Sequence, residues 1–117
     1  MAKFTRVYFD DQGETHFERV NSASHRSDSG LLSETLQTKA MFFRDSAGIN
    51  DFDWHNAPQR LFIVMLEGKV EIEVSDGSKC VFEPGDVMLM EDTGGKGHKS
   101  RSPDGNGRST MIVLLDG

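Results

Sequence analysis

The chain has 117 residues, which suits one domain with a single core. Its net charge of −6 argues against nucleic acid as a partner, because phosphate binding requires a basic patch. It has no apolar run of the roughly 20 residues that a membrane helix needs and no visible secretory leader. The single cysteine, Cys80, cannot form an internal disulfide. These features predict a cytoplasmic protein in one domain, residues 1–117, with no membrane partner.

The first half of the chain predicts short strands joined by polar turns. The alternating stretches 4–9 (FTRVYF) and 15–20 (THFERV) flank the turn DDQG, as in a hairpin. The serine-rich stretch 21–30 predicts an exposed loop. Residues 31–39 (LLSETLQTK) have the composition of a short helix, but they lead into 40–45 (AMFFRD), which favours a strand.

The second half predicts a dense series of strands after a loop at 48–54. The run 61–66 (LFIVML) is apolar at every position, so we expect it to be buried on both faces. Residues 70–74 (VEIEV) alternate strictly, and the chain returns through an Asp-Gly turn as 79–83 (KCVFE). Two further strands are expected at VMLM (87–90) and STMIVLLD (109–116). Roughly eight strands with hardly any helix predict an all-β sandwich or barrel.

Two stretches resemble the sequence motifs of the cupins. HNAPQRLFIVMLEGKVEIEVSDG (55–77) resembles the first motif and FEPGDVMLMEDTGGKGH (82–98) the second. The resemblance covers about residues 54–99 and extends to small single-domain bacterial cupins. It implies an all-β double-stranded β-helix, or jelly roll, with a pocket in the barrel mouth. It also implies a homodimer, to which the sequence itself adds only edge strands that would otherwise be unpaired.

The sequence departs from the cupin motifs at two of the metal-ligand positions. Metal-binding cupins present two histidines and a Glu or Gln in the first motif and one more histidine in the second. The likeness assigns the first histidine to His55 and the last to His98. The second histidine position holds Ala57, and the carboxylate position, seven residues before Gly68, holds Leu61. Neither replacement binds a metal.

Three interpretations of this site follow. A divalent transition metal (Fe, Mn, Ni or Zn) held by His55 and His98 with Glu91 or Asp92 would give an isomerase, lyase or dioxygenase. A metal-free pocket would bind, or transform, a small polar or anionic organic molecule, with these four residues as candidates for acid–base chemistry. A structural remnant would leave both histidines hydrogen-bonded at the rim. The loss of two ligands should remove most of the metal affinity, so the second interpretation is favoured.

Five further residues are candidate ligand contacts. One is an aromatic side chain, two are arginines that could bind an anion, and two are polar residues of the glycine-rich loop: Trp54, Arg60, Arg44, Thr93 and Lys96. Core packing is the alternative for Trp54, and surface ion pairs are the alternative for the arginines. The basic residues between Lys96 and Arg108 lie among Gly, Ser, Pro and Asp, which indicates a solvated loop.

Overall fold

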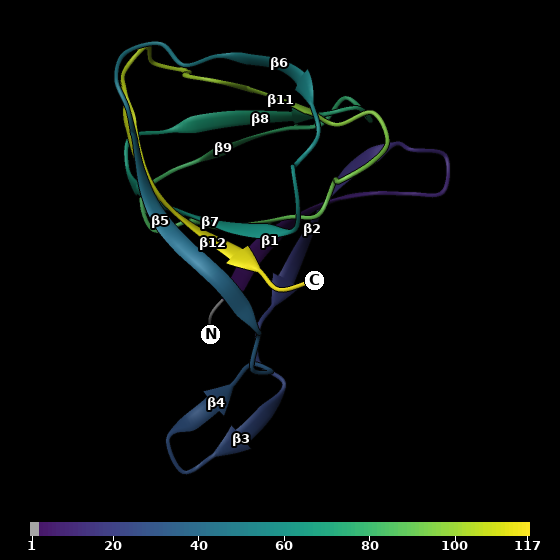
Figure 1. The fold of residues 1–117 in the computed structure, drawn as a ribbon, viewed down its shortest axis with the longest axis vertical. Helices are drawn as coiled ribbons and strands as arrows, with labels where there is room; N and C mark the ends of the chain where they lie inside the picture. The colour runs from purple at the N-terminus through teal and green to yellow at the C-terminus, as the bar shows by residue number, and fades with distance from the viewer. Residues whose placement is uncertain (1–2) are drawn as a thin grey trace.

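The computed structural model describes residues 3–117, and all regular structure in this range is β-strand (Figure 1). The strands are, in chain order, β1 Lys3–Phe9, β2 Thr15–Asn21, β3 His25–Ser27, β4 Gly30–Leu32, β5 Thr38–Ser46, β6 Phe52–His55, β7 Leu61–Glu67, β8 Val70–Val74, β9 Lys79–Phe82, β10 Val87–Met90, β11 His98–Arg101 and β12 Arg108–Leu115. The all-β prediction is confirmed. No segment of the described range is a helix that could cross a membrane.

The strands form two large sheets and one small hairpin. The first sheet has the order β2-β1-β10-β7-β12-β5, and the second has the order β6-β11-β8-β9. The pairing of β1 with β10 is parallel, whereas the other pairings are antiparallel. Figure 1 shows the two large sheets as facing layers, while the β3–β4 hairpin projects away from them.

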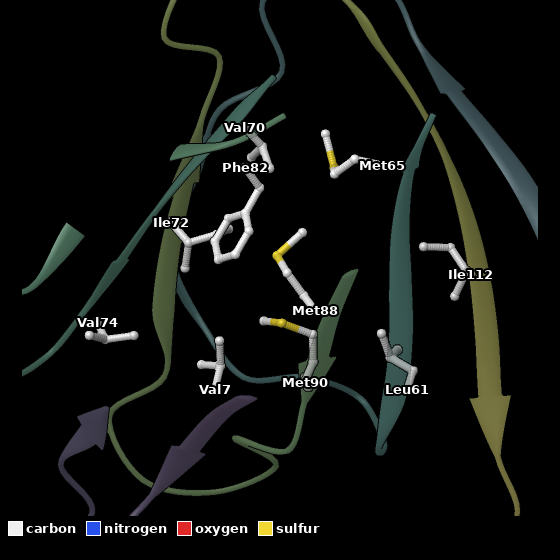
Figure 2. Packing of buried hydrophobic residues seen from close by; sticks show 11 residues of the cluster. Val7, Leu61, Met65, Val70, Ile72, Val74, Phe82, Met88, Met90 and Ile112 are labelled. Atoms are coloured by element: carbon white, nitrogen blue, oxygen red, sulfur yellow. The ribbon is translucent and has the colours of Figure 1, made fainter. Parts of the chain in front are cut away.

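The hydrophobic core lies between the two layers. Met65 and Met88 extend inward from the six-stranded sheet, and Ile72 and Phe82 from the four-stranded sheet (Figure 2). Each is at most 3% exposed. Full burial of a side chain of this size stabilises a fold by about 1.5–3 kcal/mol, so this cluster holds the two layers together.

The apolar run 61–66 is buried on one face, so the prediction of burial on both faces is wrong. In β7, Leu61 and Met65 point into the core, whereas Phe62 and Val64 on the other face are only half-buried and Leu66 is exposed. The reason is that, within residues 3–117, no third layer covers the outer face of the six-stranded sheet.

The segment expected as a short helix, 31–39, is also not helical. It contains the end of β4, an irregular connection and the start of β5. Pairing of the flanking residues with β3 and β12 overrides its helical composition, because tertiary contacts outweigh local propensity. The predicted loop 21–30 likewise contains a strand, β3, whose residues are exposed.

Candidate functional site

Two histidines distant in the sequence meet on paired strands. β6 and β11 run antiparallel, and His98 lies directly opposite His55 in their register. The two ring centroids are 4.3 Å apart, with the ring planes at 56°. Directly opposite residues share one face of a sheet, and both side chains line a cavity between the large sheets. The structure therefore brings together the two residues singled out by the motifs.

A glycine makes this close approach possible. Gly97 has a φ of +76°, and a Cβ atom there would lie 2.3 Å from the carbonyl oxygen of His55. Any side chain would push the two strands apart. The fully buried Thr15 donates its hydroxyl to the Gly97 carbonyl at 2.7 Å and so fixes the chain just before β11.

Asp92 forms a hydrogen bond with the buried ring of His98. Its Oδ2 atom is 2.5 Å from Nδ1 of His98, and the two residues are 0% and 5% exposed. A carboxylate can only accept, so Nδ1 of His98 carries the proton. Nε2 of the neutral ring is then left with its lone pair. The other carboxylate oxygen, Oδ1, has no hydrogen-bond partner among the described residues.

His55 has the same tautomer for a different reason. Its Nδ1 donates to the backbone carbonyl of Asp53 at 2.7 Å, because a carbonyl oxygen can only accept. Its Nε2 is therefore also an acceptor in the neutral ring. His55 is exposed whereas His98 is buried, so one imidazole belongs to the opening of the cavity and the other to its wall.

The cavity next to these rings has a volume of about 560 Å³, within the usual range for small-molecule sites. Two buried hydroxyl groups, of Ser100 and Thr110, lie on its wall. Apolar side chains from both sheets form most of the rest: Met65, Met88, Met90, Ile63, Ile72 and Ile112. The space therefore has the mixed character of a ligand pocket, largely apolar with a few polar groups.

Two arginines line the same cavity from strands β5 and β12. Arg44 lies opposite Thr110 in the register, and Arg108 precedes Thr110 by two residues on the same strand face. Although the chain has 19 acidic residues, neither arginine has a carboxylate within 4.0 Å in the described part of the chain. Two arginines thus line the cavity without a direct ion pair among the described residues, together with one carboxylate, Asp45.

Arg108 is held rigidly. Its Nη1 donates to Oγ of Ser102 at 3.1 Å, and its Nη2 donates to the carbonyl of Asn50 at 3.2 Å. Burial lowers the pKa of Arg108, and the nearby charge of Arg44 lowers it further, against an opposing effect of Asp51. The prediction that Arg108 belongs to a solvated loop is wrong. The alternation of Arg108, Thr110 and the following isoleucine along β12 was the signal that could have found it.

Glu91, one of the predicted acid–base candidates, is engaged elsewhere. Its carboxylate is bound by the Nε groups of Arg6 and Arg60, the latter at 2.6 Å. Burial alone would raise the pKa of Glu91, but the hydrogen bonds from the two arginines outweigh burial and lower it. Arg60 is thus half of an ion pair and does not line the cavity.

The remaining predicted contacts also lie outside the cavity lining. Trp54 is 43% exposed, with the ammonium of Lys99 5.7 Å from its ring centroid. Lys96 pairs with Glu14 at 2.7 Å, and Thr93 is exposed. Of the five ligand contacts predicted from the sequence, Arg44 alone lines the cavity.

The described residues do not complete a metal site. No group of three His, Cys, Asp or Glu side chains among them converges on one point. Ala57 and Leu61, at the two changed motif positions, are buried in the hydrophobic core. Asp92 is bonded to Nδ1 of His98, which is the place of a supporting residue and not that of a ligand. With only His55 and His98, the site lacks the three protein ligands typical of catalytic zinc.

No family model matches the chain, and no curated protein matches it. Among solved structures, it is similar to a cupin-2 domain protein from Shewanella frigidimarina, with 14% identity, a TM-score of 0.48, and coverage of 71% of this chain and 81% of the other. It is also similar to a Salmonella typhimurium protein given the name ethanolamine utilization protein Q, with 14% identity, a TM-score of 0.46, and coverage of 98% and 96%. These similarities carry no conclusion about a ligand or an activity.

Proposed function

We propose that the chain is a jelly-roll barrel of the cupin type that binds a small organic anion in its cavity without a resident metal. The cupin motifs and the two facing sheets support the barrel. One observation supports the ligand class: two arginines without a direct ion pair, against the single carboxylate of Asp45, and two histidines with fixed tautomers line one cavity.

The charges favour an anion at the arginine end. Guanidinium groups bind carboxylates and phosphates through parallel N–H donors, and such bonds are about twice as strong as neutral ones. Arg108 is pre-positioned by Ser102 and Asn50, so little side-chain freedom is lost when an anion binds. The apolar lining then contacts the body of the ligand, and the imidazoles of His55 and His98 contact a second polar group.

Proton transfer is a second candidate function, favoured by the Asp92–His98 pair. Nε2 of His98 can take a proton from a bound molecule, and the Asp92 carboxylate then stabilises the imidazolium, as in other Asp–His pairs. Return of the proton to another position of the same molecule would give an isomerase, and loss of a leaving group would give a lyase. Neither reaction requires the two missing metal ligands.

The test of anion binding uses succinate, benzoate and inorganic phosphate as probes, with succinamide as the uncharged counterpart of succinate. NMR titration should show saturable shifts with the anions and none with succinamide. Arg44→Gln and Arg108→Gln should each weaken binding by at least about tenfold, the effect of losing a hydrogen bond to a charged group. Arg101→Gln is the matched control, because Arg101 pairs with Glu71 outside the cavity.

Equal affinity in the Arg108→Gln and Arg101→Gln variants would refute the anion site. Elemental analysis of the purified protein should show metal well below one equivalent, and a stoichiometric metal that is lost in His55→Ala would refute the metal-free proposal. His98→Asn separates the two candidate functions, since it should abolish any turnover while anion binding remains detectable and remains sensitive to Arg108→Gln.

A further inference from the structure

The two polar ends of the cavity require different groups on a bound molecule. Guanidinium groups carry N–H donors only, so Arg44 and Arg108 can bind only an acceptor. In the neutral imidazoles of His55 and His98, Nδ1 is already bonded and Nε2 offers a lone pair, so this end can bind only a donor. Nε2 of neither ring has a hydrogen-bond partner in the described part of the chain. A molecule that satisfies both ends is therefore an acceptor at one end and a donor at the other.

Two further polar groups of the cavity wall are buried hydroxyls. Ser100 lies opposite the core residue Ile72 in the register, and so it is on the inner face of its sheet. Thr110 lies opposite the core residue Met65 and is on the inner face of the other sheet. The two residues are 8% and 6% exposed, and neither hydroxyl bonds another described residue. Buried polar groups are normally hydrogen-bonded, so these hydroxyls also indicate a polar molecule in the cavity.

Strand β11 gives the distance between the two ends. His98 is its first residue, and Ser102 follows its last. Nη1 of Arg108 donates to Oγ of Ser102 at 3.1 Å, so the guanidinium lies at the Ser102 end. From His98 to Ser102 the chain rises by about 13 Å, with Ser100 halfway. Hydrogen bonds of about 3 Å at each end leave about 7 Å for the ligand, which suits a six-carbon chain.

The charges around the histidine end favour a hydroxyl over an ammonium as the donor. Asp45 is the only carboxylate among the described residues that line the cavity, and it adjoins Arg44 at the arginine end. Asp92 is bonded to Nδ1 of His98 and does not line the cavity. An ammonium beside the histidines would therefore be desolvated without a counter-ion, which is costly. A hydroxyl is neutral and requires one acceptor only.

We infer that the ligand is a hydroxycarboxylate bound in one direction, an inference that rests on the proposed anion site. Its carboxylate binds Arg44 and Arg108, and its far hydroxyl donates to Nε2 of His98. The acceptor is His98 because it is buried, where water does not compete, whereas His55 is exposed and can bond water. The two wall hydroxyls can donate or accept, so they accommodate an oxygen substituent in the middle of the chain.

Four six-carbon acids that differ only at the far end test this inference: 6-hydroxyhexanoate, hexanoate, adipate and 6-aminohexanoate. NMR titration at about pH 8, where free imidazole is neutral, gives their Kd values. 6-Hydroxyhexanoate should bind at least about threefold more tightly than hexanoate, which leaves the His98 lone pair without a donor. It should also bind more tightly than adipate, whose second carboxylate can only accept, and than 6-aminohexanoate, whose ammonium has no counter-ion.

Two histidine variants locate the acceptor. His98→Phe should abolish the preference for 6-hydroxyhexanoate over hexanoate. His25→Phe should keep it, because His25 lies in β3, outside the cavity. Loss of His98 also affects stability, so nitrogen NMR of the natural chain provides a second measurement. In that spectrum 6-hydroxyhexanoate should shift the Nε2 resonance of His98 by more than hexanoate does.

The outcomes separate this inference from the proposed function. Binding of hexanoate that is weakened by Arg108→Gln, with less than about a threefold preference for 6-hydroxyhexanoate, would overturn the hydroxycarboxylate and leave the anion site in place. Equal or tighter binding of adipate or 6-aminohexanoate would do the same. A preference that persists in His98→Phe would overturn the assignment of His98 as the acceptor. No binding of any of the four acids would refute the anion site and the inference together.

Discussion

The buried pair of Asp92 and His98 predicts a large energetic coupling. A hydrogen bond to a charged group contributes about 1.5–3 kcal/mol, and breaking a buried pair by removing one partner costs about 3–5 kcal/mol. Asp92 has one oxygen without a protein partner, so part of its own desolvation cost is already present in the native state. We therefore expect Asp92→Ala to lower the free energy of unfolding by about 3 kcal/mol, at the low end of this range.

The double variant gives the specific test. His98→Phe removes the other partner and should cost about 3 kcal/mol, because it leaves a buried carboxylate without a donor. Asp92→Ala with His98→Phe removes both groups, so its effect should be smaller than the sum of the two single effects by about 2 kcal/mol. Urea unfolding followed by circular dichroism measures all three, with unchanged m-values as the condition for comparing them.

His55→Phe is the matched control, since the exposed His55 bonds only a backbone carbonyl in the described structure. It should change the free energy of unfolding by no more than about 0.5 kcal/mol. Additive single effects, or an Asp92→Ala variant within about 0.5 kcal/mol of the natural sequence, would show that the two side chains do not depend on each other.

Two further predictions concern backbone fit and pH. Gly97→Ala should destabilise by about 3 kcal/mol or more because its Cβ meets a neighbouring strand, whereas Gly77→Ala, with φ +94° and nothing within 4 Å, should cost only about 1–2 kcal/mol; equal losses in thermal unfolding would contradict this. His16 bridges Asp10 and Asp76 at 2.8 Å each, and its hydrogen bonds to them raise its pKa. This contribution should be complete below the unfolded pKa of about 6.5 and disappear as pH rises through the raised folded pKa. A Tm profile from roughly pH 5 to 9 that His16→Asn leaves unchanged would disprove it.

The strand pattern was predictable wherever one face alone is buried. The alternation of VEIEV in 70–74 reappears as β8, with its valines and isoleucine buried and its glutamates half-buried. Prediction failed where the burial depended on neighbours that the local sequence does not reveal. The run 61–66 has the pattern of a strand buried on both faces, yet no layer formed by the described residues covers its outer face. Residues 31–39 look helical, yet they become strand by pairing.

The candidate site was likewise predictable only in part. His55 and His98 could be paired in advance because the resemblance to cupins places them on neighbouring strands. Asp92 was singled out for its nearness to His98 in the sequence, although as a ligand or base and not as the group that fixes its tautomer. Glu91 differs from it by one position and points to two arginines instead, because adjacent residues here face opposite ways. Side-chain direction decided the role of each acid.

The two arginines that line the cavity could not both be found from the cupin motifs. The cupin motifs end before β12, so Arg108 has no counterpart in them. Two of the expected metal-ligand positions carry apolar residues in the core, and the positive charge facing the cavity comes from β5 and β12 of the six-stranded sheet. A site that has exchanged a metal cation for two guanidinium groups would retain the attraction for anions while losing Lewis-acid chemistry. This is why the Arg44→Gln and Arg108→Gln variants decide the ligand class more directly than changes to either histidine.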